Sequence, residues 1–186
     1  AREIDALGGV MGRATDAARI HFRMLNRSKG PAVWSPRAQC DRELYPRGVR
    51  RILDGLEHLD LFQDMVTGMW LEDNGLRGVI TRGGVRFVAG AVVVTAGTFL
   101  RGRIHVGGDA GVPAGRAGEA PSIELAEVLE ARGLEIARFK TGTPPRVDGR
   151  TVDFSRLEVQ PGDEGDYRFS AYTEETIPEQ RVCWIT

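Results

Sequence analysis

Apolar residues recur at helical spacing over the first 25 positions of the chain. Between residues 3 and 25 they fall on one face, which predicts a single amphipathic helix packed on a sheet. Gly8 and Gly9 weaken this helix near its start. A loop rich in Ser, Lys, Gly and Pro follows at 26–36, and a second helix, loosened by an internal proline and glycine, is expected over 37–59.

Short apolar segments separated by turn residues replace the helical pattern after Leu59. A strand is expected from Leu59 to Val66. Three further short strands are separated by hairpin turns, at Asp73-Asn74-Gly75 and at Arg82-Gly83-Gly84. The pattern therefore predicts a three-stranded antiparallel meander with strands at 69–72, 76–81 and 85–88.

The run Val92-Val93-Val94-Thr95 ends in the small residues Ala96 and Gly97. A buried parallel strand over 91–95 that brings backbone to a bound cofactor has this pattern, which favours an α/β nucleotide-binding domain. A tight turn after an ordinary core strand explains the same residues equally well. The sequence contains no Gly-x-Gly-x-x-Gly phosphate loop, so we expect a piece of a larger flavoprotein.

The second half of the chain alternates glycine-rich and periodic segments. A glycine-rich segment at 102–118 leads to an acidic helix, which Ser122 is expected to cap and which ends near Arg132. A strand is expected at 134–139. Past Arg146 the chain becomes polar and weakly periodic, so we place a domain boundary there.

The amino-acid composition restricts the kinds of binding partner and the cellular compartment that we expect for this chain. The 186 residues carry 25 Lys and Arg against 26 Asp and Glu, so any contact with RNA must come from a local patch. Two distant cysteines argue against a disulfide scaffold or a zinc site, which favours a reducing, cytoplasmic setting. No membrane-length apolar run is present, and the missing initiator Met suggests a start inside a longer reading frame.

Five cations lie in or beside loops rich in glycine and proline, where a fixed charge suits a phosphate, an anionic flavin or an RNA backbone. They are Lys29, Arg37, Arg116, Lys140 and Arg146. Scattered surface cations are the simpler interpretation of any one of them. The turn from Lys140 to Arg146 is the strongest exception, and we take Arg116, Lys140 and Arg146 as candidate cofactor-binding residues.

Cys183 is the candidate nucleophile. Its thiolate can attack the electrophilic carbon of a pyrimidine or carry a transferred group. From spacing alone, the favoured interpretation of Cys183 is a buried structural cysteine in a strand. A structural role is favoured still more strongly for Cys40, which lies in the second expected helix. The three histidines are isolated, so neither metal nor serine-hydrolase chemistry is supported.

Seven sequence blocks occur together in the order typical of one family: 3–9 (EIDALGG), 25–33 (LNRSKGPAV), 37–42 (RAQCDR), 95–100 (TAGTFL), 115–118 (GRAG), 140–146 (KTGTPPR) and 183–186 (CWIT). They resemble the FAD-dependent MnmG (GidA) family of tRNA uridine 5-carboxymethylaminomethyl modification enzymes. The likeness covers essentially the whole chain.

This resemblance implies a glutathione-reductase-like FAD/NAD(P)-binding fold. Residues 1–146 are then the central part of the FAD domain, without its first phosphate loop, and 147–186 begin an inserted, NADH-binding domain. Such enzymes use FAD, NADH and methylene-tetrahydrofolate to build the 5-carboxymethylaminomethyl or 5-aminomethyl group on wobble uridine of tRNA. The resemblance also implies a homodimer that forms a heterotetramer with the GTPase MnmE, away from membranes. We expect the 186 residues alone to be inactive.

The resemblance also assigns roles to single residues. Cys183 matches a cysteine implicated in catalysis, although Val182 and Trp184 replace the usual proline and tyrosine. The family's second reactive cysteine would lie before Ala1. The expected FAD-binding positions are Val66 and Ser122, with Thr95, Gly97 and Thr98 where the strand meets the dinucleotide, and the expected NAD-binding stretch begins with Glu179, Gln180 and Arg181.

Two alternatives remain open. One is the sister folate-dependent tRNA uracil-methylating flavoenzyme, which shares the fold. The other is a non-catalytic module that binds RNA or a partner protein, against which the near-neutral charge weighs.

Overall fold

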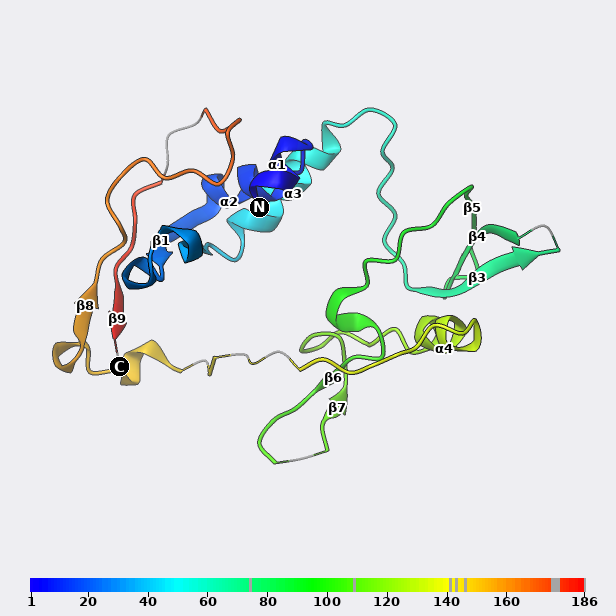
Figure 1. Cartoon of the computed structure of the whole chain (residues 1–186). Helices are drawn as coiled ribbons and strands as arrows, with labels where there is room; N and C mark the ends of the chain where they lie inside the picture. The colour runs from blue at the N-terminus through cyan, green and yellow to red at the C-terminus, as the bar shows by residue number, and fades with distance from the viewer. Residues whose placement is uncertain are drawn as a thin grey trace. The chain divides into compact units, whose positions relative to one another are not determined.

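The computed structural model describes residues 1–73, 75–108, 110–140, 142, 144–145, 147–174 and 178–185. The chain forms two compact units, the first made of Ala1–Asp60 with Pro145–Thr186 and the second of Leu61–Pro144 (Figure 1). Helices and small antiparallel sheets occur in both. The α/β class expected from the sequence is therefore confirmed.

The first unit begins with two short helices and a strand. These are α1 (Arg2–Ala6), α2 (Met11–Ala18) and β1 (Arg19–Leu25). The single helix expected over 3–25 is therefore wrong. Gly8 adopts a φ of +83°, which ends the first helix. After Ala18 the apolar residues alternate with polar ones, and this period of two belongs to a strand.

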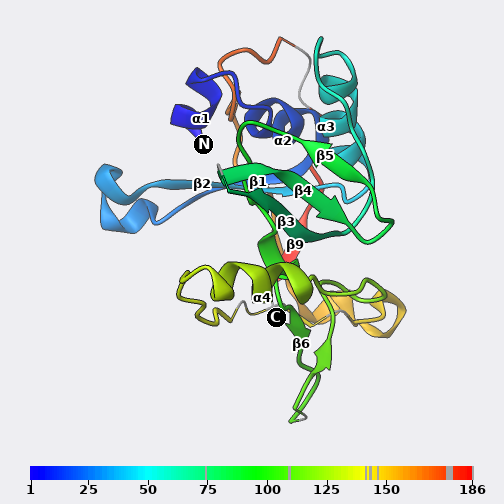
Figure 2. The same cartoon turned by 90° about the vertical axis from the view of Figure 1, so that its right-hand side faces the viewer.

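Strand β2 (Ser35–Cys40) pairs antiparallel with β1. The turns η1 (Arg27–Lys29) and η2 (Pro31–Val33) join the two strands, and this hairpin projects from the helices of its unit (Figure 2). Helix α3 (Leu44–Asp54) follows and lies beside α2. The expected helix over 37–59 is thus wrong at both ends, because residues 37–40 belong to β2 and α3 stops at Asp54.

Asp41 marks the start of α3. Its Oδ1 accepts hydrogen bonds from the backbone N–H of Leu44 at 2.9 Å and of Glu43 at 2.8 Å. These bonds lower the pKa of the Asp41 carboxyl from its ordinary value. The helix therefore begins where a side chain satisfies its first free N–H groups.

The C-terminal part of the chain, from Pro145 onward, completes the first unit. We call it the returning segment. Its elements are η4 (Gly149–Thr151), η5 (Phe154–Arg156), β8 (Glu158–Gln160) and β9 (Cys183–Ile185), and β8 pairs antiparallel with β9. The backbone N–H of Asp163 donates to the carbonyl of Phe22 at 2.8 Å, and that of Arg181 donates to the carbonyl of Ile20 at 2.6 Å. The returning segment thus occupies the edge of β1 that β2 leaves open.

Phe22 and Asp16 hold this segment in the core. The Phe22 ring stacks on Tyr167 with centroids 4.7 Å apart and meets Phe169 edge-on at 5.9 Å. The buried Asp16 carboxylate accepts hydrogen bonds from the Phe169 N–H, the Ser170 N–H and the Thr173 hydroxyl, each within 3.0 Å. One buried charge is therefore satisfied by groups about 150 residues further along the chain.

The second unit contains the expected meander of β3 (Val66–Glu72), β4 (Gly75–Thr81) and β5 (Arg86–Val88), paired in that order. This prediction is confirmed. The strand expected from Leu59 to Val66 is wrong, because residues 59–65 form no strand and β3 begins at Val66. The unit also holds η3 (Gly97–Phe99), β6 (Arg103–Ile104), β7 (Val112–Pro113) and α4 (Glu124–Ala131).

Two further expected strands are absent. Residues 91–95 and 134–139 form no strand, and Val93 and Phe139 are 84% and 95% exposed. An apolar run forms a buried strand only when a neighbouring strand pairs with it, and no described strand does so here. Periodicity alone could not reveal this.

The acidic helix α4 is confirmed, but its start differs from the expectation. Its N-terminal capping position is Ile123, and no side chain caps it. The Ser122 hydroxyl instead donates to the carbonyl of Val66. Of the expected turn at 140–146, Thr141, Thr143 and Arg146 lie outside the described residues. In the described part of the chain, no helix is long and apolar enough to cross a bilayer.

Candidate functional sites in the two units

The second unit contains an open pocket of about 830 Å³, a volume within the usual range of small-molecule sites. Its walls come from β3, β4, the start of α4 and Val92–Val94, which we call the valine run. The lining residues are Gln63, Asp64, Met65, Val66, Met69, Val79, Ala91–Ala96, Phe99, Glu119, Ser122 and Leu125.

Three of the residues expected to bind FAD line this pocket, namely Val66, Thr95 and Ser122. The Ser122 hydroxyl donates to the Val66 carbonyl at 3.4 Å, and the Ser122 N–H donates to the Phe99 carbonyl at 2.8 Å. These bonds connect β3, η3 and the segment before α4. The structure therefore brings together residues that lie 56 positions apart in the chain.

Gly97 and Thr98 lie beside the pocket, in η3, and are not among its lining residues. Gly97 has a φ of +57°, and a Cβ there would meet nothing within 4 Å. The Thr98 hydroxyl donates to the Gly115 carbonyl at 3.1 Å, which connects η3 with the glycine-rich loop. In this structure Thr98 thus fixes the loop that approaches the pocket.

Arg116 lies at the rim of the same pocket. Its guanidinium pairs with Glu119 at 2.7 Å and lies over the Phe99 ring, 5.6 Å from the centroid. Both partners line the pocket. Lys140 is exposed and is not among the lining residues, and Arg146 lies outside the described residues.

Asp64 and Glu119 are pocket residues that the sequence did not suggest. The Thr81 hydroxyl and the Met65 N–H lower the pKa of the Asp64 carboxyl from its ordinary value, so this group is a carboxylate at neutral pH. Carboxylates at a nucleotide pocket can accept hydrogen bonds from ribose hydroxyls. Neither residue stands in a recognisable motif, so no sequence signal identified them.

The first unit contains Cys183, half-buried at the start of β9. Its thiol donates to Oε1 of Gln39 with a sulfur to oxygen distance of 3.7 Å. Gln39 lies on β2 and is the cross-strand partner of His21. The sequence did not single out Gln39, because its contact with Cys183 depends on how the returning segment docks.

The residues expected to begin an NAD-binding stretch take part in the fold. Oε1 of Gln180 accepts the Phe22 N–H at 2.7 Å, and its Nε2 donates to the Asp163 carbonyl at 2.9 Å. The Arg181 carbonyl accepts a hydrogen bond from Nδ1 of the buried His21 at 2.9 Å. Glu179 is exposed.

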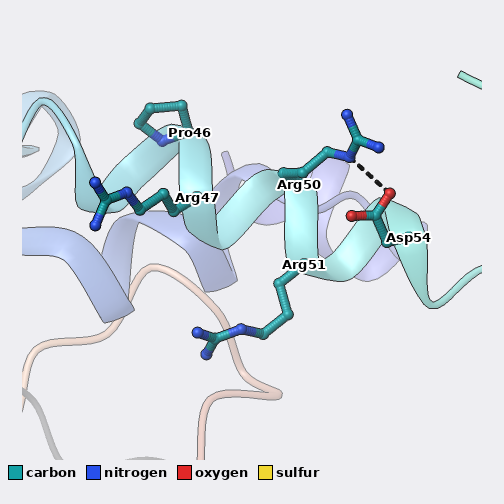
Figure 3. Close-up of a pocket in the computed structure, with 5 residues that line it drawn as sticks. All are labelled: Pro46, Arg47, Arg50, Arg51 and Asp54. Atoms are coloured by element: carbon teal, nitrogen blue, oxygen red, sulfur yellow. Dashed lines mark hydrogen bonds and ion pairs between the residues drawn. The ribbon is translucent and has the colours of Figure 1, made fainter. Parts of the chain in front are cut away.

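A second hollow, of about 510 Å³, lies along α3 and is lined by Pro46, Arg47, Arg50, Arg51 and Asp54. Arg50 pairs with Asp54 at 2.6 Å, and Arg50 and Arg51 leave the helix in different directions (Figure 3). It contains none of the expected site residues. Across the described ranges, no three His, Cys, Asp or Glu residues form a group that could hold a metal ion.

Comparison with known proteins decides the family. The family model described as "Glucose inhibited division protein A" matches residues 1–186. The chain belongs to the GidA family. Among curated relatives, it is 52% identical over 185 residues to the tRNA uridine 5-carboxymethylaminomethyl modification enzyme MnmG of Thermodesulfovibrio yellowstonii, and 50% identical over 190 residues to that of Salinibacter ruber.

The fold of this chain is also similar to solved structures of the GidA family. The chain superposes on GidA of Aquifex aeolicus in two crystal forms with TM-scores of 0.86 and 0.87, at 45% sequence identity. These matches cover 98% of this chain and 31% of the other. The chain spans about 30% of the length of the GidA-family proteins that it matches.

Proposed function

We propose that this chain is part of an FAD-dependent enzyme that modifies wobble uridine in tRNA. The product is the 5-carboxymethylaminomethyl or 5-aminomethyl group. The observation that carries this proposal is 52% identity, over the entire chain, to a relative named for that modification. The cofactors proposed are FAD and NADH, with methylene-tetrahydrofolate as the one-carbon donor.

The pocket in the second unit fits the adenosine end of FAD. Val66 and Ser122 lie on its wall, apolar side chains such as Met69 and Val79 suit the adenine ring, and Asp64 suits ribose hydroxyls. Bound FAD supplies the redox chemistry needed to pass a one-carbon unit from folate to the base. We propose that Thr95, Gly97, Thr98 and Arg116 contact the same cofactor, with Lys140 and Arg146 as further cations.

Cys183 is proposed as the catalytic thiol. It is half-buried, and its thiol makes one hydrogen bond with the residues that the structure describes, to Gln39, so the described fold depends little on its sulfur. A thiolate here can add to the pyrimidine ring of the target uridine. This contact pattern supports a chemical role over the structural one that spacing alone favoured.

The domain assignment and the partners remain part of the proposal. Residues 1–146 would belong to a glutathione-reductase-like FAD domain, and 147–186, with Glu179, Gln180 and Arg181, would begin the NADH-binding domain. The two compact units divide the chain differently, because Pro145–Thr186 pack with Ala1–Asp60 and Leu61–Pro144 form the other unit. A homodimer that binds the GTPase MnmE, and inactivity of the 186 residues alone, complete the proposal.

The test uses the protein encoded by the complete gene, expressed in a strain that lacks its own wobble-uridine modification. Nucleosides from the tRNA of that strain are analysed by mass spectrometry. Appearance of the 5-carboxymethylaminomethyl or 5-aminomethyl nucleoside is the expected result. A 5-methyl product would favour the sister uracil-methylating flavoenzyme, and an unmodified wobble uridine would contradict both.

A further inference from the structure

Positive charge is concentrated on the first-unit hairpin formed by β1, η1, η2 and β2. Between residues 19 and 40 the hairpin holds five Arg or Lys residues and no acidic residue, although the whole chain has a net charge of −1. Arg19 is buried, and the other four are exposed or half-buried. Such a local excess is typical of a surface that meets an anionic partner. The hairpin therefore supplies the local patch that contact with RNA requires.

Two arginines face each other within this hairpin. Arg23 on β1 and Arg37 on β2 are direct cross-strand partners, so their side chains leave the same face of the ribbon. Like charges placed opposite each other destabilise an antiparallel pair. Within the chain, the Arg23 guanidinium donates to the Pro161 carbonyl at 3.0 Å and pairs with Asp163, which leaves Arg37 as the member of the pair that an external anion can neutralise.

The described chain neutralises this pair incompletely. Asp163 lies 3.6 Å from Arg23 and 3.1 Å from Arg27, and the same carboxylate also accepts the Met24 N–H at 2.6 Å. The Arg37 side chain is exposed, and its guanidinium makes no hydrogen bond or ion pair with any residue that the structure describes. One carboxylate thus serves two guanidinium groups, and the third, that of Arg37, is available to a partner.

The same face of the ribbon leads to the candidate thiol. Gln39 lies two residues after Arg37 on β2, and residues two apart in a strand share a face about 7 Å apart. Gln39 accepts the hydrogen bond of the Cys183 thiol. Gln39 on β2 therefore links the arginine pair, which lies on β1 and β2, to the thiol of Cys183 on β9.

We infer that Arg37, together with Arg23, binds a backbone phosphate of the substrate RNA, and so positions the uridine base at Cys183. The ligand is a phosphodiester of a single-stranded RNA loop, because a base stacked in a duplex is not accessible to a thiol. This inference rests on the proposed function, since Cys183 is its reference point. Arg37 is a positioning residue in this scheme, and Cys183 remains the catalytic one.

The test measures RNA binding apart from modification. The protein from the complete gene is titrated against a fluorescently labelled, unmodified tRNA transcript, and Kd is followed by anisotropy over a series of KCl concentrations. For Arg37→Gln we expect weaker binding at low salt and a slope of log K against log salt reduced by about 0.7 to 0.9, the value of one phosphate contact. Arg37→Lys keeps the charge and is expected to keep most of the slope.

Two controls separate the possible outcomes. Arg132→Gln makes the same change at an exposed position in the other unit and is expected to leave the slope unchanged. Cys183→Ser is expected to bind RNA as the unaltered protein does. An unchanged slope in Arg37→Gln, in a protein that still binds and modifies tRNA, overturns the inference and leaves the proposed function standing. Failure of the unaltered protein to bind tRNA overturns both.

Discussion

The Ser122 hydroxyl donates a hydrogen bond to the Val66 carbonyl at 3.4 Å, which joins the start of the α4 segment to the first strand of the meander. Both residues line the 830 Å³ pocket. Ser122 is 4% exposed and its backbone also pairs with Phe99 and Arg101. One buried serine thus fixes one wall of the proposed adenosine site.

This geometry predicts the effect of filling the pocket. In the protein from the complete gene, Ser122→Trp places an indole where the cofactor would lie, so the ratio of flavin absorbance to protein absorbance is expected to fall severalfold. Thr95→Trp is the companion variant, because Thr95 is exposed on the pocket wall and its replacement does not disturb the core. Ser122→Ala, which removes only one hydrogen bond, is expected to retain flavin. Full flavin content in both Trp variants would remove this pocket from the cofactor site.

Cys183→Ser is expected to abolish wobble-uridine modification and to leave bound FAD unchanged. The reason is that a hydroxyl is a far weaker nucleophile than a thiolate, while the hydrogen bond that the thiol donates to Gln39 is one that serine can also make. Nucleoside analysis and the flavin spectrum measure the two effects on one preparation. Cys40→Ser serves as the matched control, and modification that survived Cys183→Ser would exclude the catalytic role.

The reactivity of the Cys40 thiol should depend on pH in a defined direction. It is half-buried, and burial raises the pKa of its thiol above the ordinary 9.0. The folded state therefore holds this proton more tightly than the unfolded state, so the resulting stability is complete below pH 9.0 and is lost as pH rises through the folded-state pKa. We expect alkylation of Cys40 by iodoacetamide in the native protein to be slow at neutral pH. Its rate should reach half-maximum at a higher pH than in urea, and equal midpoints would contradict the assignment.

Asp16 should be among the most sensitive positions in the first unit. Asp16→Ala leaves two buried backbone N–H groups and the Thr173 hydroxyl without their acceptor. The expected loss is about 3 kcal/mol of unfolding free energy, because donors to a buried carboxylate are costly to leave unpaired. Urea denaturation measures the loss, and limited proteolysis should cut within 166–173.

The matched control for Asp16 is Asp166→Ala. Asp166 pairs with Arg168 at 3.0 Å, but its side chain is 70% exposed. An exposed pair of this kind contributes at most about 1 kcal/mol. Equal losses from the two variants would show that the buried carboxylate does not hold the returning segment.

Local sequence signals predicted the elements that depend on local interactions. The meander follows from turn residues such as Gly83-Gly84 between β-forming segments, and α4 follows from its apolar spacing. The region 19–25 was misassigned because its apolar residues satisfy a helical spacing and a strand alternation at once. Only the pairing of β1 with β2 and with the returning segment decides between them.

The candidate sites depended on contacts that no local pattern contains. Val66 and Ser122 were assigned by family resemblance, and their contact spans 56 residues. The contact between Gln39 and Cys183 spans 144 residues. The pairing of Arg23 with Arg37 requires the β-register, which a helical interpretation of both segments had excluded.

The valine run has a practical consequence for anyone who handles these 186 residues on their own. Val92, Val93 and Val94 combine strong β-forming side chains with a backbone that no described strand pairs, and Val93 is 84% exposed. Such a segment is a template on which a second copy can add a strand. Preparations of this piece are therefore expected to self-associate as concentration rises, and one charged residue in place of Val93 should keep them monodisperse.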